Sequence, residues 1–202
     1  NNKALVDENT RLKKLIEYQN QYPSDSALPK FSASYHFDYV AAKIVNNTIS
    51  KSINYITIDK GSKDGIVKGL GVISSNGVVG FVTNVSENFS LVMSVISVKT
   101  QIGVRHKNTN ALGSLRWNGE NPFLLQVDGF SKTLPIKKND TILTAGFSSI
   151  FFFYLIVATV KQLEPDESTS FYRMDVQLTN NINSLSYVYV VKNEKKKELD
   201  SL

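Results

Sequence analysis

The stretch from Ile58 to Gly80 constrains the fold of this chain more than any other. A short alternating run at 56–58 leads into a loop rich in glycine and charge, and another apolar run follows Asn76-Gly77. Such alternation predicts strands, and Asn-Gly between two apolar runs predicts a tight hairpin. We interpret the stretch as turns that separate strands and not as a chemical site. Its expected turn residues are Gly61, Asp64, Gly65, Gly69, Gly77 and Gly80.

Two acidic residues, Asp59 and Asp64, flank this loop, and paired carboxylates can serve general acid–base chemistry. Asp beside glycine more often caps backbone N–H groups of a turn, so we favour the structural role. We expect Gly61 and Gly65 to hold backbone conformations that a β-carbon disfavours. The loop also lacks the Gly-Lys-Ser/Thr order of a phosphate-binding loop.

A weaker copy of the pattern recurs later in the chain, which indicates an internal duplication. Residues 68–74 align with residues 138–144, and residues 78–85 align with residues 156–163. Two similar all-β units in tandem are therefore expected.

Strand-like runs separated by short turns fill most of the chain in two sets of six. No helical pattern separates them, which argues against βαβ units and favours antiparallel barrels or sandwiches. We predict a mainly β protein with two small six-stranded β-barrels, at 36–106 and 107–192, either of which can be completed by strands from the other half. The expected strands are 39–45, 53–59, 71–74, 78–85, 91–95, 101–105, 111–116, 123–127, 141–144, 156–162, 171–178 and 187–191.

Residues 1–22 carry the helical signal, with apolar residues at heptad-like spacing among charged ones. This pattern predicts a coiled-coil helix that self-associates, with docking onto the same chain as the alternative. Residues 23–35, which include Pro23 and Pro29, are predicted to be a linker, and residues 193–202 a charged tail. The expected dimer contacts are Leu5, Leu12, Leu15, Ile16 and Tyr22.

Composition and charge argue against several functions. The chain has no cysteine, so thiolate chemistry is excluded. Its net charge is +5, but the basic residues are scattered except near the C-terminus, so no nucleic-acid partner is expected. The longest apolar run, 150–160, is shorter than the roughly 20 residues of a membrane-spanning helix. Because the chain opens within a helical pattern, we expect a further N-terminal part.

A catalytic site is not predicted. The two histidines, His36 and His106, are far apart in sequence and are interpreted as surface or junction residues. No serine lies in a nucleophile motif, which leaves a Ser-His-Asp enzyme without support. Two distant histidines without cysteine do not form a metal site, so no metal and no cofactor are expected.

Several dispersed motifs, in order, resemble those of the rod-shape-determining protein MreC family. They are the segment 58–66 followed by Gly77-Val78-Val79-Gly80, the segment 113–119, and the segment 139–151. The leading helix, with Asn9-Thr10-Arg11-Leu12-Lys13, is similar to the end of that family's coiled coil. The resemblance covers nearly the whole chain.

The resemblance implies a non-enzymatic scaffold of the bacterial cell-wall elongation complex that maintains rod shape. It implies a homodimer, anchored in the inner membrane by a single helix N-terminal to this sequence, with this part on the extracytoplasmic, periplasmic side. The implied partners are MreD, MreB, RodA and a penicillin-binding transpeptidase that the scaffold activates. The alternatives are a glycan- or peptidoglycan-binding β module and a degenerate protease-like enzyme. The glycan module would use Trp117, Tyr187 and Tyr189.

One segment departs from the family pattern. After Phe151 the family usually has a turn rich in proline and glycine, whereas this chain continues with apolar β-formers to Ala158. In a small barrel strand alternate side chains point outward, so some of these residues should be exposed. We predict a self-association or partner-docking face, or a disordered loop, with simple burial as the alternative. The residues concerned are Phe151, Phe152, Phe153, Tyr154 and Leu155.

Overall fold

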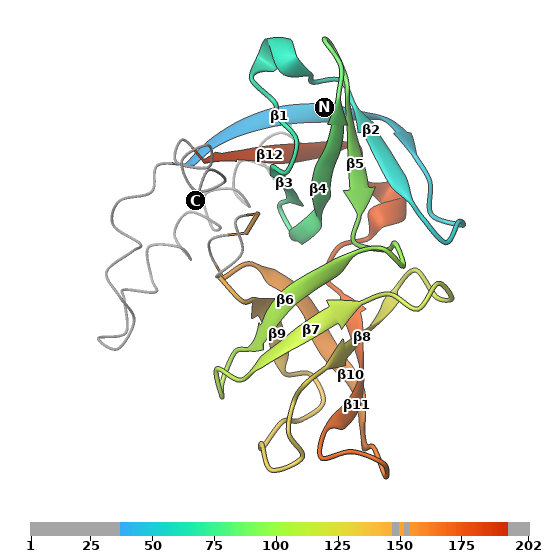
Figure 1. Ribbon diagram of the computed structural model, residues 1–202, viewed down its shortest axis with the longest axis vertical. Coiled ribbons are helices and arrows are strands. Elements are labelled where there is room, and N and C mark those ends of the chain that lie inside the picture. The colour runs from blue at the N-terminus through green and yellow to red at the C-terminus, as the bar shows by residue number, and fades with distance from the viewer. Residues whose placement is uncertain (1–36, 147–149, 152–153, 194–202) are drawn as a thin grey trace.

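The computed structural model describes residues 37–146, 150–151 and 154–193 of the chain (Figure 1). The predicted coiled-coil helix, its dimer contacts, the linker, His36 and the charged tail beyond residue 193 lie outside these residues. No helix within the described ranges is long and apolar enough to cross a membrane.

The described residues form twelve strands, and each of the expected strands is present. Short 3₁₀ helices occur at Ser62–Asp64 and Ile182–Ser184. The strands are β1 (Phe37–Asn47), β2 (Tyr55–Ile58), β3 (Gly71–Ser74), β4 (Gly77–Val85), β5 (Ser90–Ser94), β6 (Gln101–His106), β7 (Leu112–Arg116), β8 (Leu124–Asp128), β9 (Thr141–Thr144), β10 (Ile156–Pro165), β11 (Tyr172–Leu178) and β12 (Tyr187–Asn193).

The strands close into two six-stranded barrels, one above the other in Figure 1. The first has the order β1-β12-β3-β4-β5-β2, and the second has the order β10-β11-β8-β7-β6-β9. All pairs are antiparallel, and closure leaves neither sheet with an open edge. The predicted fold class is confirmed for the described residues.

The expected division of the chain at residue 106 does not hold for the last strand of either half, an exchange that the prediction allowed for. Strand β6 closes the second barrel, and strand β12 closes the first, so each half of the chain supplies one strand to the other barrel. Alternation marks a strand and its buried face, but it does not select the barrel whose core that face fills. Here Val104 of β6 and Val190 of β12 are both completely buried.

The internal repeat is confirmed by local geometry. The aligned residues Val79 and Val157 are the extra residues of equivalent β-bulges, where β4 meets β3 and β10 meets β9. The aligned Gly69 and Asn139 both adopt left-handed backbone, with φ of 84° and 72°. Each barrel therefore contains five consecutive strands of one repeat and one strand, β12 or β6, that follows the other repeat.

One apolar core runs through both barrels. Inward-facing residues alternate along the strands, such as Ile56 and Val92 in the first barrel and Leu125 and Val176 in the second, and all four are fully buried. Burying one such side chain stabilises the fold by about 1.5–3 kcal/mol.

The junction between the barrels is held by a buried polar residue and by close backbone packing. Asn180, which follows β11, donates to the carbonyl of Val78 at 2.7 Å and accepts from the hydroxyl of Ser74. A β-carbon on Gly77 would lie 2.2 Å from the carbonyl oxygen of Ile156, so the two repeats approach too closely here for any side chain. The two barrels are therefore packed directly against each other.

Candidate interaction surface

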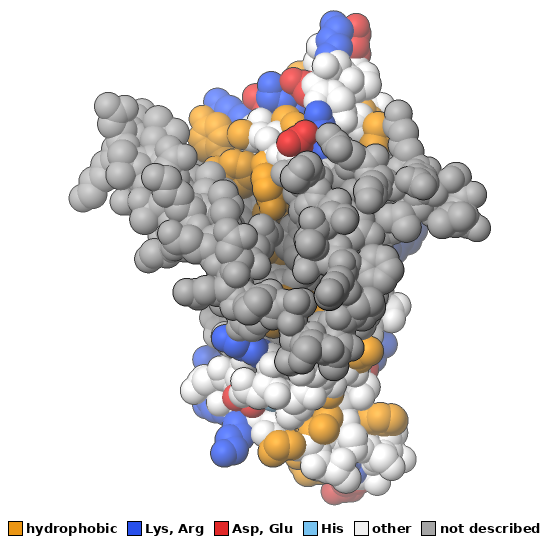
Figure 2. Space-filling view, turned by 90° about the vertical axis from the view of Figure 1, so that its left-hand side faces the viewer, with side chains coloured by type: hydrophobic (Ala, Val, Ile, Leu, Met, Phe, Trp, Pro, Cys, Tyr) orange, Lys and Arg blue, Asp and Glu red, His pale blue; other side chains and the backbone are white. Residues whose placement is uncertain are grey.

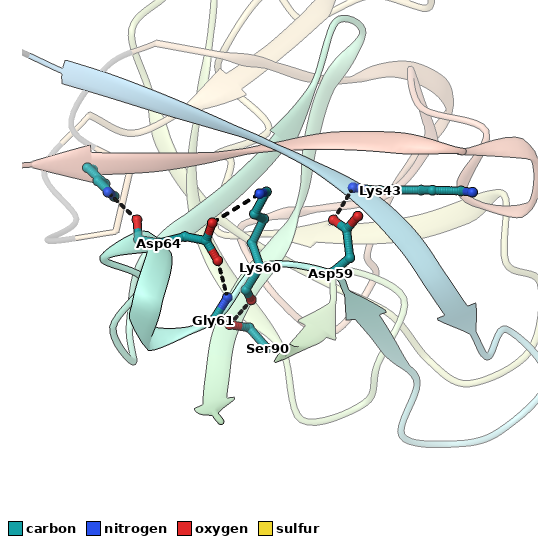
Figure 3. A network of polar contacts seen from close by, with 7 residues as sticks. Lys43, Asp59, Lys60, Gly61, Asp64 and Ser90 are labelled. Carbon is teal, nitrogen blue, oxygen red and sulfur yellow. Dashed lines mark hydrogen bonds and ion pairs between the residues drawn. The ribbon is translucent and has the colours of Figure 1, made fainter. Parts of the chain in front are cut away.

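The glycine loop that follows β2 is fixed by a network centred on Asp64 (Figure 3). Its carboxylate accepts from the backbone N–H of Gly61 and from Lys60 Nζ, each at 3.0 Å. These two contacts lower the pKa of Asp64 below its ordinary value of 3.8, the Gly61 N–H having the larger effect. The Asp64 contact also raises the pKa of Lys60. Lys192 of β12 donates to the Asp64 carbonyl at 2.6 Å, which ties the loop to the strand from the other repeat.

The second acidic residue of the loop has a separate structural role. Asp59 accepts from the backbone N–H of Lys43 at 2.7 Å, away from the Asp64 network (Figure 3). Each carboxylate thus satisfies a backbone donor, but only Asp64 caps the turn itself, since the donor to Asp59 belongs to β1, and the two are not directed at one common site. Among the described residues, no group of three His, Asp or Glu side chains could hold a metal ion.

The glycines of the loop are required for two different reasons. Gly65 has φ of 75°, the left-handed conformation that was expected. Gly61 differs from the expectation, because its backbone is extended, with φ of −135°. A β-carbon there would lie 2.5 Å from the carbonyl oxygens of Ser86 and Glu87, so Gly61 is required by close approach to the β4–β5 hairpin.

The remaining turn glycines show the same two requirements. Gly69 and Gly77 have positive φ, whereas Gly80 packs against the backbone of β5.

His106 is not a surface residue. It ends β6, is fully buried, and lies 3.0 Å through Nε2 from a carboxylate oxygen of Asp140. Its Nδ1 is 2.8 Å from the hydroxyl of Thr109. Both ring nitrogens therefore have structural partners, and the residue stabilises the turns at one end of the second barrel.

The aromatic residues proposed for a glycan module do not form one exposed platform. Trp117 is buried, and its indole N–H donates to the carbonyl of Asn121 at 2.8 Å. Tyr187 is exposed, and Tyr189 of the same strand is half-buried. Trp117 belongs to the core of the second barrel, so this set cannot act together.

The apolar segment after β9 is largely buried where it is described. Phe151 and Leu155 are 2% and 4% exposed, so the expectation of an exposed face is wrong for both residues. Phe151 packs against Gly71 of β3, where the missing side chain leaves room for its ring. Tyr154 is half-buried, and its ring lies 4.4 Å from the guanidinium of Arg105. Phe152 and Phe153 lie outside the described residues.

The first barrel has an apolar outer surface that the motif analysis did not identify. Tyr55, Met93 and Phe81 form one row across β2, β5 and β4. Leu91 of β5 extends the surface, and all four side chains are half-buried while their sequence neighbours fill the core. We call Tyr55, Phe81, Leu91 and Met93 the apolar face. In the sequence, a face of this kind is indicated by a strand whose residues are apolar on both of its faces, instead of apolar on one face and polar on the other.

A groove of about 400 Å³ continues the apolar face under the β4–β5 hairpin. Phe89, near the tip of this hairpin, is 47% exposed. A protein interface typically has an apolar centre with a polar rim, and the apolar face with its groove has this character. The groove is lined by Thr57, Asn84, Val85, Ser86, Phe89, Ser90 and Leu91.

The second barrel shows that the fold does not require an apolar surface at this place. In the row of β8, β11 and β10 that corresponds to Tyr55, Met93 and Phe81, the residues are Leu124, Gln177 and Thr159. Asp175 corresponds to Leu91. Leu91 pairs with Asn84, Asp175 pairs with Gln162, and Asn84 and Gln162 are aligned in the internal repeat. Three of the four positions are therefore polar in the second barrel.

Positive and negative side chains are mixed among the described residues of one face (Figure 2). On the face shown in Figure 2, Lys and Arg side chains are spread over both barrels among Asp and Glu side chains.

Comparison with known proteins gives one consistent result. Residues 44–192 match the family model "Rod shape-determining protein MreC, barrel core". A cell shape-determining protein MreC from Caulobacter vibrioides is 31% identical over 144 residues, which are 71% of this chain and 37% of that protein. The Haemophilus influenzae protein of the same name is 28% identical over 67% of this chain and 38% of its own length. The chain thus spans about two fifths of these relatives.

Solved structures share the fold. A crystal structure of MreC from Pseudomonas aeruginosa has a TM-score of 0.70 and 24% identity, covering 77% of this chain and 99% of that one. A complex between the penicillin-binding protein PBP2 and MreC from Helicobacter pylori contains a chain with a TM-score of 0.60 and 16% identity, covering 79% of this chain and 99% of that one.

Proposed function

Because this chain belongs to the MreC family of rod shape-determining proteins, we propose that it is a non-enzymatic scaffold of the complex that elongates the cell wall. In this proposal it binds and activates a peptidoglycan transpeptidase through the apolar face and the adjoining groove of the first barrel. The observation that carries the proposal is the difference between two barrels of equivalent topology, of which only the first has an apolar outer row.

One further fact supports a protein partner at this surface, and a second indicates the class of that partner. The apolar face lies on regular strands of a closed barrel, so it offers a rigid surface that loses little conformational entropy on binding. The Helicobacter pylori MreC, whose fold is similar, is found in a complex with a penicillin-binding protein. A transpeptidase of that class is therefore the partner to test first.

The proposal also includes a homodimer and a membrane anchor. Leu5, Leu12 and Leu15 form the predicted seam of the coiled coil, and an N-terminal membrane helix would hold the barrels on the extracytoplasmic side of the inner membrane. MreD, RodA and MreB are the further partners of this assembly. If deletion of residues 1–22 leaves the mass in sedimentation experiments unchanged at every concentration, the helix is not the dimer contact.

The test of the docking surface replaces apolar residues of the first barrel by their counterparts in the second. The double variant Phe81→Thr and Met93→Gln should weaken binding to the purified transpeptidase by about tenfold or more, since central apolar contacts dominate interface energies. Gln177→Ala, on the corresponding surface of the second barrel, is the matched control and should bind normally. Circular dichroism verifies the fold of each variant. Unchanged affinity of a folded double variant would exclude this face as the docking site.

A further inference from the structure

The second barrel also has a groove under its corresponding hairpin, between β10 and β11. It has a volume of about 340 Å³, and its chemistry differs from that of the first groove. Two arginines and two aspartates lie beside one exposed aromatic ring, whereas the lining of the first groove contains no charged residue. The groove is lined by Arg116, Asp128, Gly129, Asp166, Thr169, Phe171, Tyr172 and Arg173.

The charges in this groove are balanced and accessible. Arg116 Nε lies 2.7 Å from Asp128 Oδ2, and Arg173 Nη2 lies 3.7 Å from Asp166 Oδ2. The arginine side chains are 61% and 72% exposed. Exposed pairs of this kind contribute only about 0–1 kcal/mol, so a ligand can rearrange them at little cost. The lining has two positive and two negative groups, and Lys132, whose Nζ donates to the Asp166 carbonyl, adds one positive charge beside it, so the attraction to a polyanion is weak.

The walls of the groove are ordered by hydrogen bonds. The hydroxyl of Tyr172 donates to the carbonyl of Lys132 at 3.1 Å, and its backbone N–H donates to Phe130 at 2.8 Å. Asp166 accepts from the hydroxyl and the N–H of Ser168, at 2.7 and 2.9 Å. Carboxylate acceptors and guanidinium donors are thus held beside Phe171, which is 47% exposed.

A continuous row of polar side chains leads away from this groove. Cross-strand pairing places Gln101, Arg116, Gln126, Asp175 and Gln162 side by side on five adjacent strands. All of these side-chain groups are planar: the glutamine amides both donate and accept hydrogen bonds, the guanidinium donates, and the carboxylate accepts. An elongated ligand bearing many hydroxyl or amide groups would match this row, whereas a protein interface would need an apolar centre.

We propose that this groove and the polar row bind an uncharged oligosaccharide chain. The arginine–aspartate pairs would bond to sugar hydroxyl and acetamide groups, and one sugar ring would lie on Phe171, whose negative π-face attracts C–H groups. Gly129, which has no side chain, leaves room at the lining of the groove. The site differs from the aromatic set considered from the sequence, because Trp117 is buried.

The test is titration of the full 202-residue chain with chitohexaose, an uncharged oligosaccharide, by calorimetry and by NMR. Phe171→Ala should weaken binding about tenfold, because it removes the stacking ring. Phe89→Ala is a matched control, since this ring is also 47% exposed but lies in the groove of the first barrel, and it should leave binding unchanged. Arg173→Ala should weaken binding without loss of folding, because its side chain is 72% exposed.

Four outcomes would overturn the proposal. The first is that the wild-type chain shows no binding at about 10 mM chitohexaose, because a dissociation constant above that concentration is too weak for useful recognition. The second is equal weakening by Phe171→Ala and Phe89→Ala. The third is binding of polyglutamate but not of chitohexaose, which would make the surface electrostatic. Loss of transpeptidase affinity in Phe171→Ala, with chitohexaose binding unchanged, would assign the groove to a protein partner instead.

Discussion

Replacing each of two glycines in one loop by alanine tests how this fold uses close backbone contact. Gly65 has positive φ, and alanine in that conformation costs about 1–2 kcal/mol. An added β-carbon would also come within 2.6 Å of Lys192 Nζ, but that group ends a flexible side chain and can move. When Lys192 moves, its hydrogen bond to the Asp64 carbonyl is lost, which lowers the stability by about 1 kcal/mol more. Gly65→Ala should therefore lower the free energy of unfolding by about 1–3 kcal/mol.

Gly61→Ala should be more destabilising, although the φ of Gly61 suits any residue. The added β-carbon would lie 2.5 Å from two backbone carbonyl oxygens, of Ser86 and Glu87, and neither can move alone. Relief requires the loop to separate from the hairpin, which breaks the bonds from Ser62 N to Ser86 O and from Lys63 N to Glu87 O. Two lost bonds and the disturbed packing around them amount to about 3 kcal/mol or more.

Urea unfolding followed by tryptophan fluorescence measures both free energies. We expect the lowest midpoint for Gly61→Ala, and for Gly65→Asn, a residue that tolerates left-handed backbone, only the loss of about 1 kcal/mol from the Lys192 hydrogen bond. A larger loss for Gly65→Ala than for Gly61→Ala would refute the close-contact argument. Transpeptidase affinity of folded Gly65→Ala, which leaves the hairpin in place, should be unchanged, and its loss would mean that the loop is itself a contact.

Three further changes test other parts of the fold. Phe151→Ala should lower the free energy of unfolding by about 3–5 kcal/mol in urea titration, because its ring is buried against Gly71, and a change below about 1 kcal/mol would contradict its burial. Asn180→Ala should lower it by about 1–3 kcal/mol, because Ser74 and Val78 lose a buried partner, and an unchanged midpoint would contradict that role. Since the pKa of Asp64 is lowered on folding, its contribution is present above pH 3.8 and is lost as the pH falls through the folded-state value. The stability difference between wild type and Asp64→Asn should therefore shrink on acidification below pH 3.8, as thermal melts at a series of pH values will show.

The sequence determined the strands and the repeat because both depend on local patterns. Alternating burial along β2 and β5 is visible as alternating residue types, and the similarity of 78–85 to 156–163 extends to bulges at Val79 and Val157. The exchange of β6 and β12 has no local signal, since both strands have apolar inward residues that suit either barrel. Strand partners are selected by the closure of the whole sheet.

The interaction surfaces were harder to predict for a related reason. Trp117 and Phe151 are large apolar residues that the sequence alone could place at a surface, but the fold buries both. Tyr55, Phe81 and Met93 are separated in sequence and become one row only through strand pairing. Their significance depends on comparison with the second barrel, which requires the register of both sheets.

Site-specific photocrosslinking in living cells can show which barrel the transpeptidase contacts. A photoreactive amino acid at Phe89, in the groove of the first barrel, should give a crosslinked product that contains the transpeptidase. The same amino acid at Gln177, which is exposed on the corresponding strand of the second barrel, should give none. A transpeptidase adduct at Gln177 with none at Phe89 would contradict docking on the first barrel.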